Sequence, residues 1–246
     1  MTTVGQIERQ TQTRVVALFR DRLGYDYLGD WIDRAGFEGK GNRNIEPELL
    51  TAWLNKQGVS ATLIHRALYE LEKAAGDTGK SLYDRNRAVY EMLRYGVKVR
   101  PEAGENTVTV WPLDWKHPAK NHFAIAEEVT VKGADAKAST KRPDVVLYVN
   151  GIALGVLELK RSTVSVAEGI RQNLDNQKKE FIQPFFSTLQ WVMAGNDTEG
   201  LRYATIETPE KYYLKWVEES GAHADESNLL DRLLLQVCEK ARAFSH

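Results

Sequence analysis

The sequence predicts an α/β or α+β fold in which helices flank a central mixed β-sheet. Apolar residues recur at helical spacing through the first 96 residues, whereas segments rich in β-branched and aromatic residues dominate from residue 97 onward. The composition agrees, because 246 residues with 42% hydrophobic and 27% charged content are typical of a globular chain. We expect one domain over 1–246, with a helical part at about 1–96 and a sheet-containing core at about 97–246.

Four helices are predicted in the first part of the chain. Each has apolar residues on one face, and glycine, proline or serine marks several of the ends. The segment 36–44 contains three glycines and two asparagines, so we expect a surface loop there. The first helix runs from near Gln6 to Gly24, the second from Pro47 to Gly58, the third begins after the cap Ser60, and the fourth covers about 84–95.

The second part is predicted to supply the strands and two more helices. Ser165 and Glu168 have the spacing of a capping box at a helix start, and the last helix begins near Ser227. The segments rich in valine, threonine, isoleucine and aromatic residues are 97–100, 107–111, 123–131, 144–149, 152–161, 188–195 and 201–206.

Charge and cysteine content exclude several classes of protein. Lys and Arg number 33 against 34 Asp and Glu, so DNA binding would need a local basic patch rather than an overall positive field. The single cysteine, Cys238, lies among leucines and excludes disulfide frameworks and Cys-type zinc sites. No apolar run is long enough for a membrane span or secretory signal, so we expect a cytoplasmic protein with no membrane partner.

The most informative segment is a predicted β-hairpin that carries charged residues. Two apolar strands meet at Asn150-Gly151, the strongest short hairpin signal. In the second strand Glu158 and Lys160 share one face, and Asp144 opens the first strand. Two carboxylates and a lysine are the groups that a divalent cation and a phosphodiester require.

The register of this hairpin decides whether the two carboxylates meet. A strict two-residue loop at Asn150-Gly151 would place Asp144 opposite Leu157, so that Asp144 and Glu158 point to opposite faces. We therefore predict a bulge, a three-residue connection or a kink after Pro143 that restores a shared face. The alternative is a surface Asp at a strand start and a Glu-Lys pair on an edge strand, with no chemical role.

The same residues resemble a known family. Pro143-Asp144 followed by Glu158-Leu159-Lys160 resembles the PD-(D/E)xK nuclease signature, and its setting is similar to the N-terminal nuclease domain of the restriction (R) subunit of type I restriction-modification enzymes. The resemblance extends over nearly the whole chain. It includes the segments 8–16, 23–29, 93–97, 142–146 and 194–197.

This resemblance implies a restriction-endonuclease-like core and Mg²⁺-dependent hydrolysis of phosphodiester bonds in foreign, unmodified DNA. Carried over by position, Asp144 and Glu158 would hold Mg²⁺, or Mn²⁺ as a substitute, together with the carbonyl of Leu159. Lys160 would position or activate the attacking water and stabilise developing negative charge on the phosphate.

Two further catalytic residues follow from the resemblance. Glu8 on the first helix matches an additional acidic residue that assists the metal, although it also fits a solvated helix start. Gln172 matches the first residue of a Gln-x-x-x-Tyr motif, but Asn176 stands where Tyr is usual. Gln172 and Asn176 share one helix face, for which solvent exposure is the alternative interpretation.

Local charge near the motif agrees with DNA binding. The segment 132–179 contains nine Lys and Arg against five Asp and Glu. A solvated face explains any one of these cations equally well. The expected contacts to DNA phosphates are Lys141, Arg142, Arg161, Arg171, Lys178 and Lys179.

In the family, this domain is followed by a longer ATP-driven DNA translocase. The present sequence has no valid nucleotide-binding motif, so we expect a fragment of a longer chain or a stand-alone relative, with ATP acting only through absent motor domains. The expected partners are DNA and, for the full-length protein, the modification (methylase) and specificity subunits. Two alternatives stay open: a stand-alone PD-(D/E)xK repair-type nuclease, and a catalytically silent DNA-binding or docking module.

Overall fold

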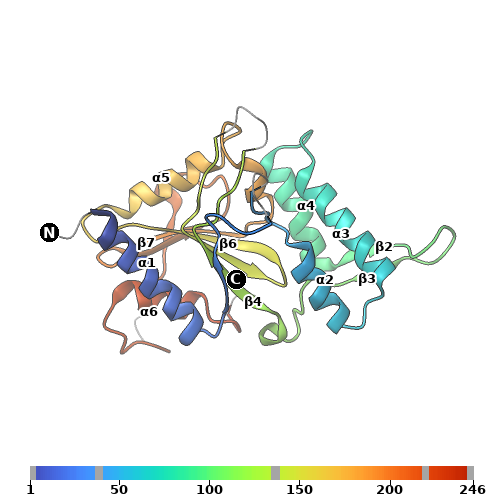
Figure 1. The fold of residues 1–246 in the computed structure, drawn as a ribbon, viewed down its shortest axis with the longest axis horizontal. Coiled ribbons are helices and arrows are strands. Elements are labelled where there is room, and N and C mark those ends of the chain that lie inside the picture. Colours follow the sequence, from blue (N-terminus) through green and yellow to red (C-terminus); the bar gives the residue numbers. More distant parts are fainter. Residues whose placement is uncertain (1–3, 37–40, 134–138, 218–221, 243–246) are drawn as a thin grey trace.

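A seven-stranded mixed sheet with helices on both faces organises the chain (Figure 1). The computed structural model describes residues 4–36, 41–133, 139–217 and 222–242. The strand order is β1-β4-β5-β6-β7-β8-β9, in which β1/β4 and β6/β7 are parallel and the other pairs are antiparallel. The strands are β1 (Asp26–Asp30), β4 (Phe123–Glu127), β5 (Val145–Val149), β6 (Ile152–Leu159), β7 (Trp191–Asn196), β8 (Gly200–Ala204) and β9 (Leu214–Lys215).

Six α-helices lie in the described ranges, and they confirm the predicted helices. The predicted α/β or α+β fold is therefore confirmed. Three short 3-10 helices complete the set: η1 (Pro118–Lys120), η2 (Gln183–Ser187) and η3 (Glu210–Tyr212). The α-helices are α1 (Val4–Asp21), α2 (Pro47–Lys56), α3 (Ala61–Gly76), α4 (Leu82–Tyr95), α5 (Val166–Asn176) and α6 (Leu229–Val237).

The sheet separates two hydrophobic cores, because its side chains alternate between its faces. On one face, residues such as Leu147 and Leu157 pack with α1, α6 and the helices α2–α4. On the other face, Val146 and Val156 pack against α5. All residues of β5 and β6 are buried, so the hairpin that carries the predicted motif runs through the centre of the molecule.

Three details differ from the sequence-based prediction. Strand β1 lies in the part of the chain that was predicted to be helical. Its sequence lacks the alternating pattern of a strand, and it is held in the extended form by parallel pairing with β4 at the edge of the sheet. The predicted strand 107–111 pairs as β3 (Val108–Val110) with β2 (Val97–Val99) in a separate two-stranded sheet. Glu168 forms an ion pair with Arg171, so only the Ser165 half of the predicted capping box forms.

The glycine-rich segment 36–44 is not simply a surface loop. Asn42 is buried, and its side-chain amide donates to the carbonyls of Trp31 and Thr130 at 3.0 Å each. The prediction of a surface loop is therefore wrong at Asn42, and residues 37–40 lie outside the described residues. Cys238 is fully buried as predicted, and this burial raises the pKa of its thiol to about 12.

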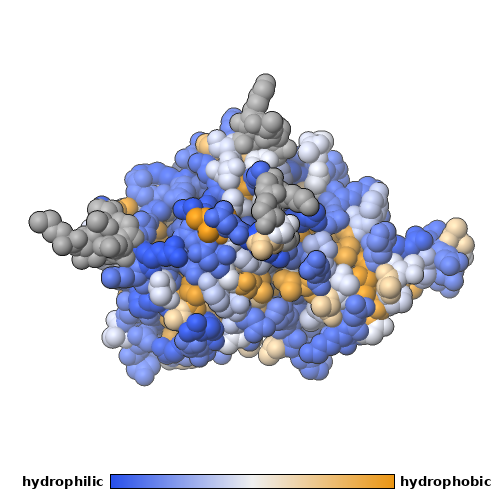
Figure 2. Space-filling model, viewed as in Figure 1, coloured by the Kyte–Doolittle hydropathy of each residue, from blue (hydrophilic) through white to orange (hydrophobic). Residues whose placement is uncertain are grey.

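The molecular surface is mostly hydrophilic on the face seen in Figure 2, with hydrophobic residues interspersed among polar ones. No helix in the described parts of the chain has the length and hydrophobicity needed to cross a bilayer.

The predicted turn at Asn150-Gly151 is buried rather than exposed. Both residues have positive φ angles, 50° and 82°, as a two-residue hairpin turn requires. The Asn150 side chain accepts from the backbone N–H of His122 and donates to the Pro112 carbonyl. A Cβ atom at Gly151 would lie 2.8 Å from the carbonyl oxygen of Glu46, so this turn packs directly against the start of α2.

We predict that Gly151→Ala lowers the free energy of unfolding by about 3 kcal/mol or more, since it combines a positive φ with a backbone clash. Urea unfolding followed by circular dichroism measures this loss. The matched control is Gly58→Ala, because Gly58 has a φ of 79° and no atom within 4 Å of an added Cβ. It should cost only about 1 kcal/mol; equal losses in the two variants would contradict the packing argument.

Candidate active site

A β-bulge in the central hairpin sets which residues meet at the candidate site. Near the turn, Val149 pairs with Ile152 and Tyr148 with Ala153, but the register then shifts so that Leu147 pairs with Gly155. Leu154 is the extra residue of the bulge. The shifted register continues to the pair Val145–Leu157, so the next residues along the strands, Asp144 and Glu158, come opposite each other. The predicted bulge is confirmed.

Asp144 and Glu158 thus approach each other where β5 begins and β6 ends. Glu158 is completely buried, and β6 lies between β5 and β7 rather than at an edge of the sheet. The alternative of a Glu-Lys pair on an edge strand is therefore wrong. Asp144 is partly buried, and its Oδ2 accepts a hydrogen bond of 2.7 Å from the backbone N–H of Leu159.

Gln172 on α5 connects the acidic and basic side chains of the site. Its Nε2 donates to Oε2 of Glu158 at 2.6 Å, and its Oε1 accepts from Nζ of Lys160 at 2.8 Å. The alternative of simple solvent exposure is wrong for Gln172. Asn176, one turn further on, is also buried, and its Oδ1 has no hydrogen-bond partner among the described residues.

Gly169 allows α5 to lie this close to the sheet. A Cβ atom at this position would be 3.1 Å from Cβ of Ala194 and 3.6 Å from both Cβ of Glu158 and Cγ of Lys160. A larger residue would push the helix away from β6 and β7. The glycine therefore sets the distance across which Gln172 reaches its two partners.

Glu8 joins the site from α1. Its Oε1 lies 3.6 Å from Nζ of Lys160, whose side chain is 15% exposed. The structure therefore brings together all five residues proposed as catalytic, from three separate parts of the chain: α1, the β5–β6 hairpin and α5.

The electrostatics of the site favour a cation. Burial is the main cause that raises the pKa of Asp144 to about 6, and the charges of Glu128 and Glu8 raise it further. Burial and the charge of Asp144 raise the pKa of Glu158 well above its ordinary value. Lys160 opposes both shifts, but one ammonium group faces several carboxyls, so an additional positive charge would stabilise their ionised forms.

These residues fit a hard divalent cation. Oε1 of Glu158 is buried with no hydrogen-bond partner among the described residues, so this oxygen is available to coordinate a metal ion. Two carboxylates, with a main-chain carbonyl, match the oxygen ligands of Mg²⁺, which usually keeps several waters. No group of three or more His, Cys, Asp or Glu side chains within the described parts of the chain is arranged to hold a metal by itself.

Glu128 is a site residue that sequence reasoning missed. It follows the end of β4 with a φ of 51°, and its backbone N–H donates to the carbonyl of Asp144 at 2.9 Å. Its carboxylate pairs with Nε of Arg142 at 2.6 Å and with Nη1 of Arg9 at 3.8 Å. The sequence feature that could have indicated this residue is the pair Glu127-Glu128, which directly follows the apolar segment 123–126.

Most of the cations expected to contact DNA have partners within the protein. Arg142 pairs with Glu128, Arg171 with Glu168 and Glu210, and Lys178 with Asp175. Nζ of Lys141 lies 4.0 Å from the centre of the Phe181 ring. Arg161 is partly buried and Lys179 is exposed, and neither forms an ion pair with a carboxylate in the described ranges. The positive charge of the six residues predicted to bind DNA phosphates is thus partly neutralised by carboxylates of the protein itself.

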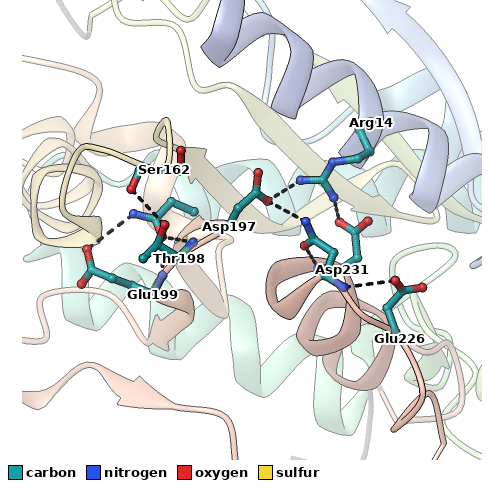
Figure 3. Close-up of polar contacts among 9 residues, drawn as sticks. Arg14, Ser162, Asp197, Thr198, Glu199, Glu226 and Asp231 are labelled. Carbon is teal, nitrogen blue, oxygen red and sulfur yellow. Dashed lines mark hydrogen bonds and ion pairs between the residues drawn. The ribbon is translucent and has the colours of Figure 1, made fainter.

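A second polar network, drawn in Figure 3, holds α1 in place. Arg14 on α1 pairs with Asp197 in the β7–β8 turn and with Asp231 on α6. The Asn228 amide donates to Oδ1 of Asp197 at 3.2 Å. Because Glu8 lies on the same helix as Arg14, this network fixes the helix that brings Glu8 to the site.

The same turn also fixes the connection between β6 and α5. Thr198 donates from Oγ1 to the Ser162 carbonyl at 3.0 Å (Figure 3). Oε1 of Glu199 accepts from the backbone N–H of Val166, the first residue of α5, at 2.9 Å. The turn therefore anchors the connection that follows β6 and the first residue of the helix that carries Gln172.

Comparison with known proteins identifies the family of this chain. A family model described as the type I restriction enzyme R protein N terminus matches residues 5–211. A putative type I restriction enzyme MjaIXP endonuclease subunit from Methanocaldococcus jannaschii is 36% identical over 78 residues, which cover 31% of this chain and 8% of that protein.

Two other curated relatives carry similar names. The type I restriction enzyme HindI endonuclease subunit of Haemophilus influenzae is 29% identical over 41% of this chain and 10% of its own length. The type I restriction enzyme SsaAORF53P endonuclease subunit of Staphylococcus saprophyticus is 26% identical over 57% of this chain and 15% of its own length. The matches thus cover only a small part of these relatives. Because the family model matches most of the sequence, the chain belongs to the family of type I restriction enzyme R protein N-terminal regions.

Proposed function

We propose that this chain is the Mg²⁺-dependent DNA endonuclease domain of a type I restriction enzyme R subunit and hydrolyses phosphodiester bonds of foreign, unmodified DNA. One observation carries the proposal: the bulge at Leu154 places Asp144 opposite Glu158, with Lys160 and Gln172 in contact beside them. The relatives' names, which describe endonuclease subunits, support it.

Asp144, Glu158 and the carbonyl of Leu159 would hold Mg²⁺ or Mn²⁺. When bound, such an ion polarises the phosphate and lowers the pKa of a bound water. Lys160 supplies a fixed positive charge for the developing negative charge on the phosphate. Gln172 orients Lys160 and Glu158 through its two hydrogen bonds, and Glu8 forms an ion pair with Lys160.

The curated relatives are much longer than the part that this chain matches, and we propose that this chain likewise belongs to a longer protein. There, ATP would act through motor domains outside this sequence, and the modification and specificity subunits would be partners in a cytoplasmic complex. A stand-alone repair-type nuclease would use the same residues without these partners. Assembly of this protein with those subunits therefore separates the two functions.

The central test is nicking of supercoiled plasmid with Mg²⁺ or Mn²⁺. We expect Asp144→Ala and Lys160→Ala each to lower the rate by about 10²-fold or more, because each removes charge at the reacting phosphate or its metal. Lys120→Ala, on exposed η1, is the control and should nick at the wild-type rate.

If the isolated chain does not nick, calorimetry of Mn²⁺ binding separates the remaining alternatives. Binding lost in Asp144→Ala would indicate a nuclease that requires its partners. Equal binding by wild type and variant would contradict the metal site and favour a silent DNA-binding module.

The raised pKa of Asp144 predicts that the stability of the folded protein depends on pH. Without metal, the folded protein loses stability as pH rises from about 4, the ordinary pKa of Asp, to about 6, its pKa in the folded protein. Asp144→Asn removes this loss, so the variant should gain about 1–3 kcal/mol above pH 6 and little at pH 4. Urea unfolding across this range measures the difference; a gain that is independent of pH would refute it.

Gly169→Ala tests the packing that positions Gln172. The added methyl group should displace α5 and lower the nicking rate by about 10-fold or more, because small misplacements of positioning groups are costly. The combined variant Gly169→Ala, Ala194→Gly removes the opposing Cβ and should recover most of the rate. No recovery would show that the glycine acts by another route.

A further inference from the structure

A basic groove lies apart from the candidate active site, between α3 and β2. It has a volume of about 720 Å³ and is bordered by residues of the α3 surface and of the strand that α3 packs against. In Figure 1, α3 and β2 lie at the opposite end of the molecule from α1 and α5, which contribute Glu8 and Gln172. Its lining consists of Ala61, Thr62, His65, Arg66, Tyr69, Glu70, Lys98, Val99 and Arg100.

The cations of this groove are not neutralised. Arg66, Lys98 and Arg100 are exposed, and no carboxylate in the described ranges forms an ion pair with any of them. Among the residues that the structure describes, the Arg100 guanidinium donates to the hydroxyl of Thr107, at 3.4 Å. Glu70 is the one carboxylate in the lining, so three positive charges face one negative charge.

This situation contrasts with the cations near Asp144. There, Arg142, Arg171 and Lys178 each pair with a carboxylate of the protein. A polyanion must break those pairs before it can use the charges, whereas Arg66, Lys98 and Arg100 have no ion pair in the described ranges that must first be broken. Three of the six cations expected to contact DNA near the candidate site are thus paired with carboxylates, whereas none of the three groove cations has such a pair in the described ranges.

The chemistry of the remaining lining favours phosphate groups. Thr62 and Tyr69 carry hydroxyl groups, and Tyr69 is 57% exposed. Hydroxyl, arginine and lysine side chains are the usual donors to DNA phosphates. A DNA duplex carries one negative charge per about 1.7 Å of its axis, so one segment of backbone can meet several of these donors.

We propose that the groove between α3 and β2 binds the phosphate backbone of duplex DNA, at a distance from the bond that is cut. The choice of partner rests on the proposed function, but binding here requires neither metal nor the residues around Asp144. Such a contact increases affinity without reading sequence, and it holds DNA on the protein while the scissile phosphate approaches the site.

The test is fluorescence anisotropy of a labelled random-sequence duplex, measured in EDTA at several salt concentrations. The combined variant Arg66→Gln, Lys98→Gln, Arg100→Gln should bind about tenfold more weakly at low salt, and the salt dependence of log K should fall by about 1 for each lost phosphate contact. These three side chains are exposed, so the variant should retain its fold, which circular dichroism checks. Lys98→Arg keeps the charge and should bind like wild type.

The matched control removes three exposed lysines elsewhere, as Lys56→Gln, Lys120→Gln, Lys215→Gln. An equal loss in this control, or no loss in the groove variant, would overturn the proposal. Preferential binding of poly-glutamate to the groove would also overturn it, in favour of an acidic protein partner. Groove-dependent DNA binding together with equal Mn²⁺ binding by wild type and Asp144→Ala would leave the inference intact and contradict the proposed nuclease. Nicking with groove-independent DNA binding would reject the inference alone.

Discussion

The extra residue in β6 is the constraint on which the rest of the site depends. Without the bulge at Leu154, Asp144 and Glu158 would point to opposite faces of the sheet. With it, the two carboxyls converge at the ends of two central, completely buried strands. Burial of a carboxyl is costly unless it has partners. Here the Gln172 amide donates to Glu158, and the charge of Lys160 favours the ionised forms of Asp144 and Glu158. The shifted pKa values of Asp144 and Glu158 reflect this incompletely compensated charge.

The surrounding helices make this arrangement rigid. Gly169 lets α5 approach β6 and β7, so that the Gln172 amide bridges Glu158 and Lys160. The β7–β8 turn holds α5 through Glu199 and α1 through Asp197 (Figure 3). One short turn thus fixes two helices that contribute side chains to the site, which is the kind of support that precise positioning requires.

Charge is distributed unevenly between the two ends of the molecule. Around Asp144, acidic residues such as Glu128 pair with nearby arginines, so positive and negative groups are interleaved. Around the groove between α3 and β2, cations predominate and lack ion-pair partners in the described ranges. A metal-dependent site needs carboxylates, whereas backbone binding needs free cations, and the fold places these two requirements on separate surfaces.

The sequence by itself determined the hairpin and the order of most elements. Local signals suffice for these: Asn150-Gly151 specifies the turn, and the alternation of a strand puts Glu158 and Lys160 on one face. Glu8 and Gln172 were expected at the site only through the resemblance to a known family. The position of the bulge, the strand β1, the burial of Asn42 and the place of Glu128 beside Asp144 were decided only by the tertiary structure. These features depend on pairing and packing between segments far apart in the chain, which local propensities do not encode.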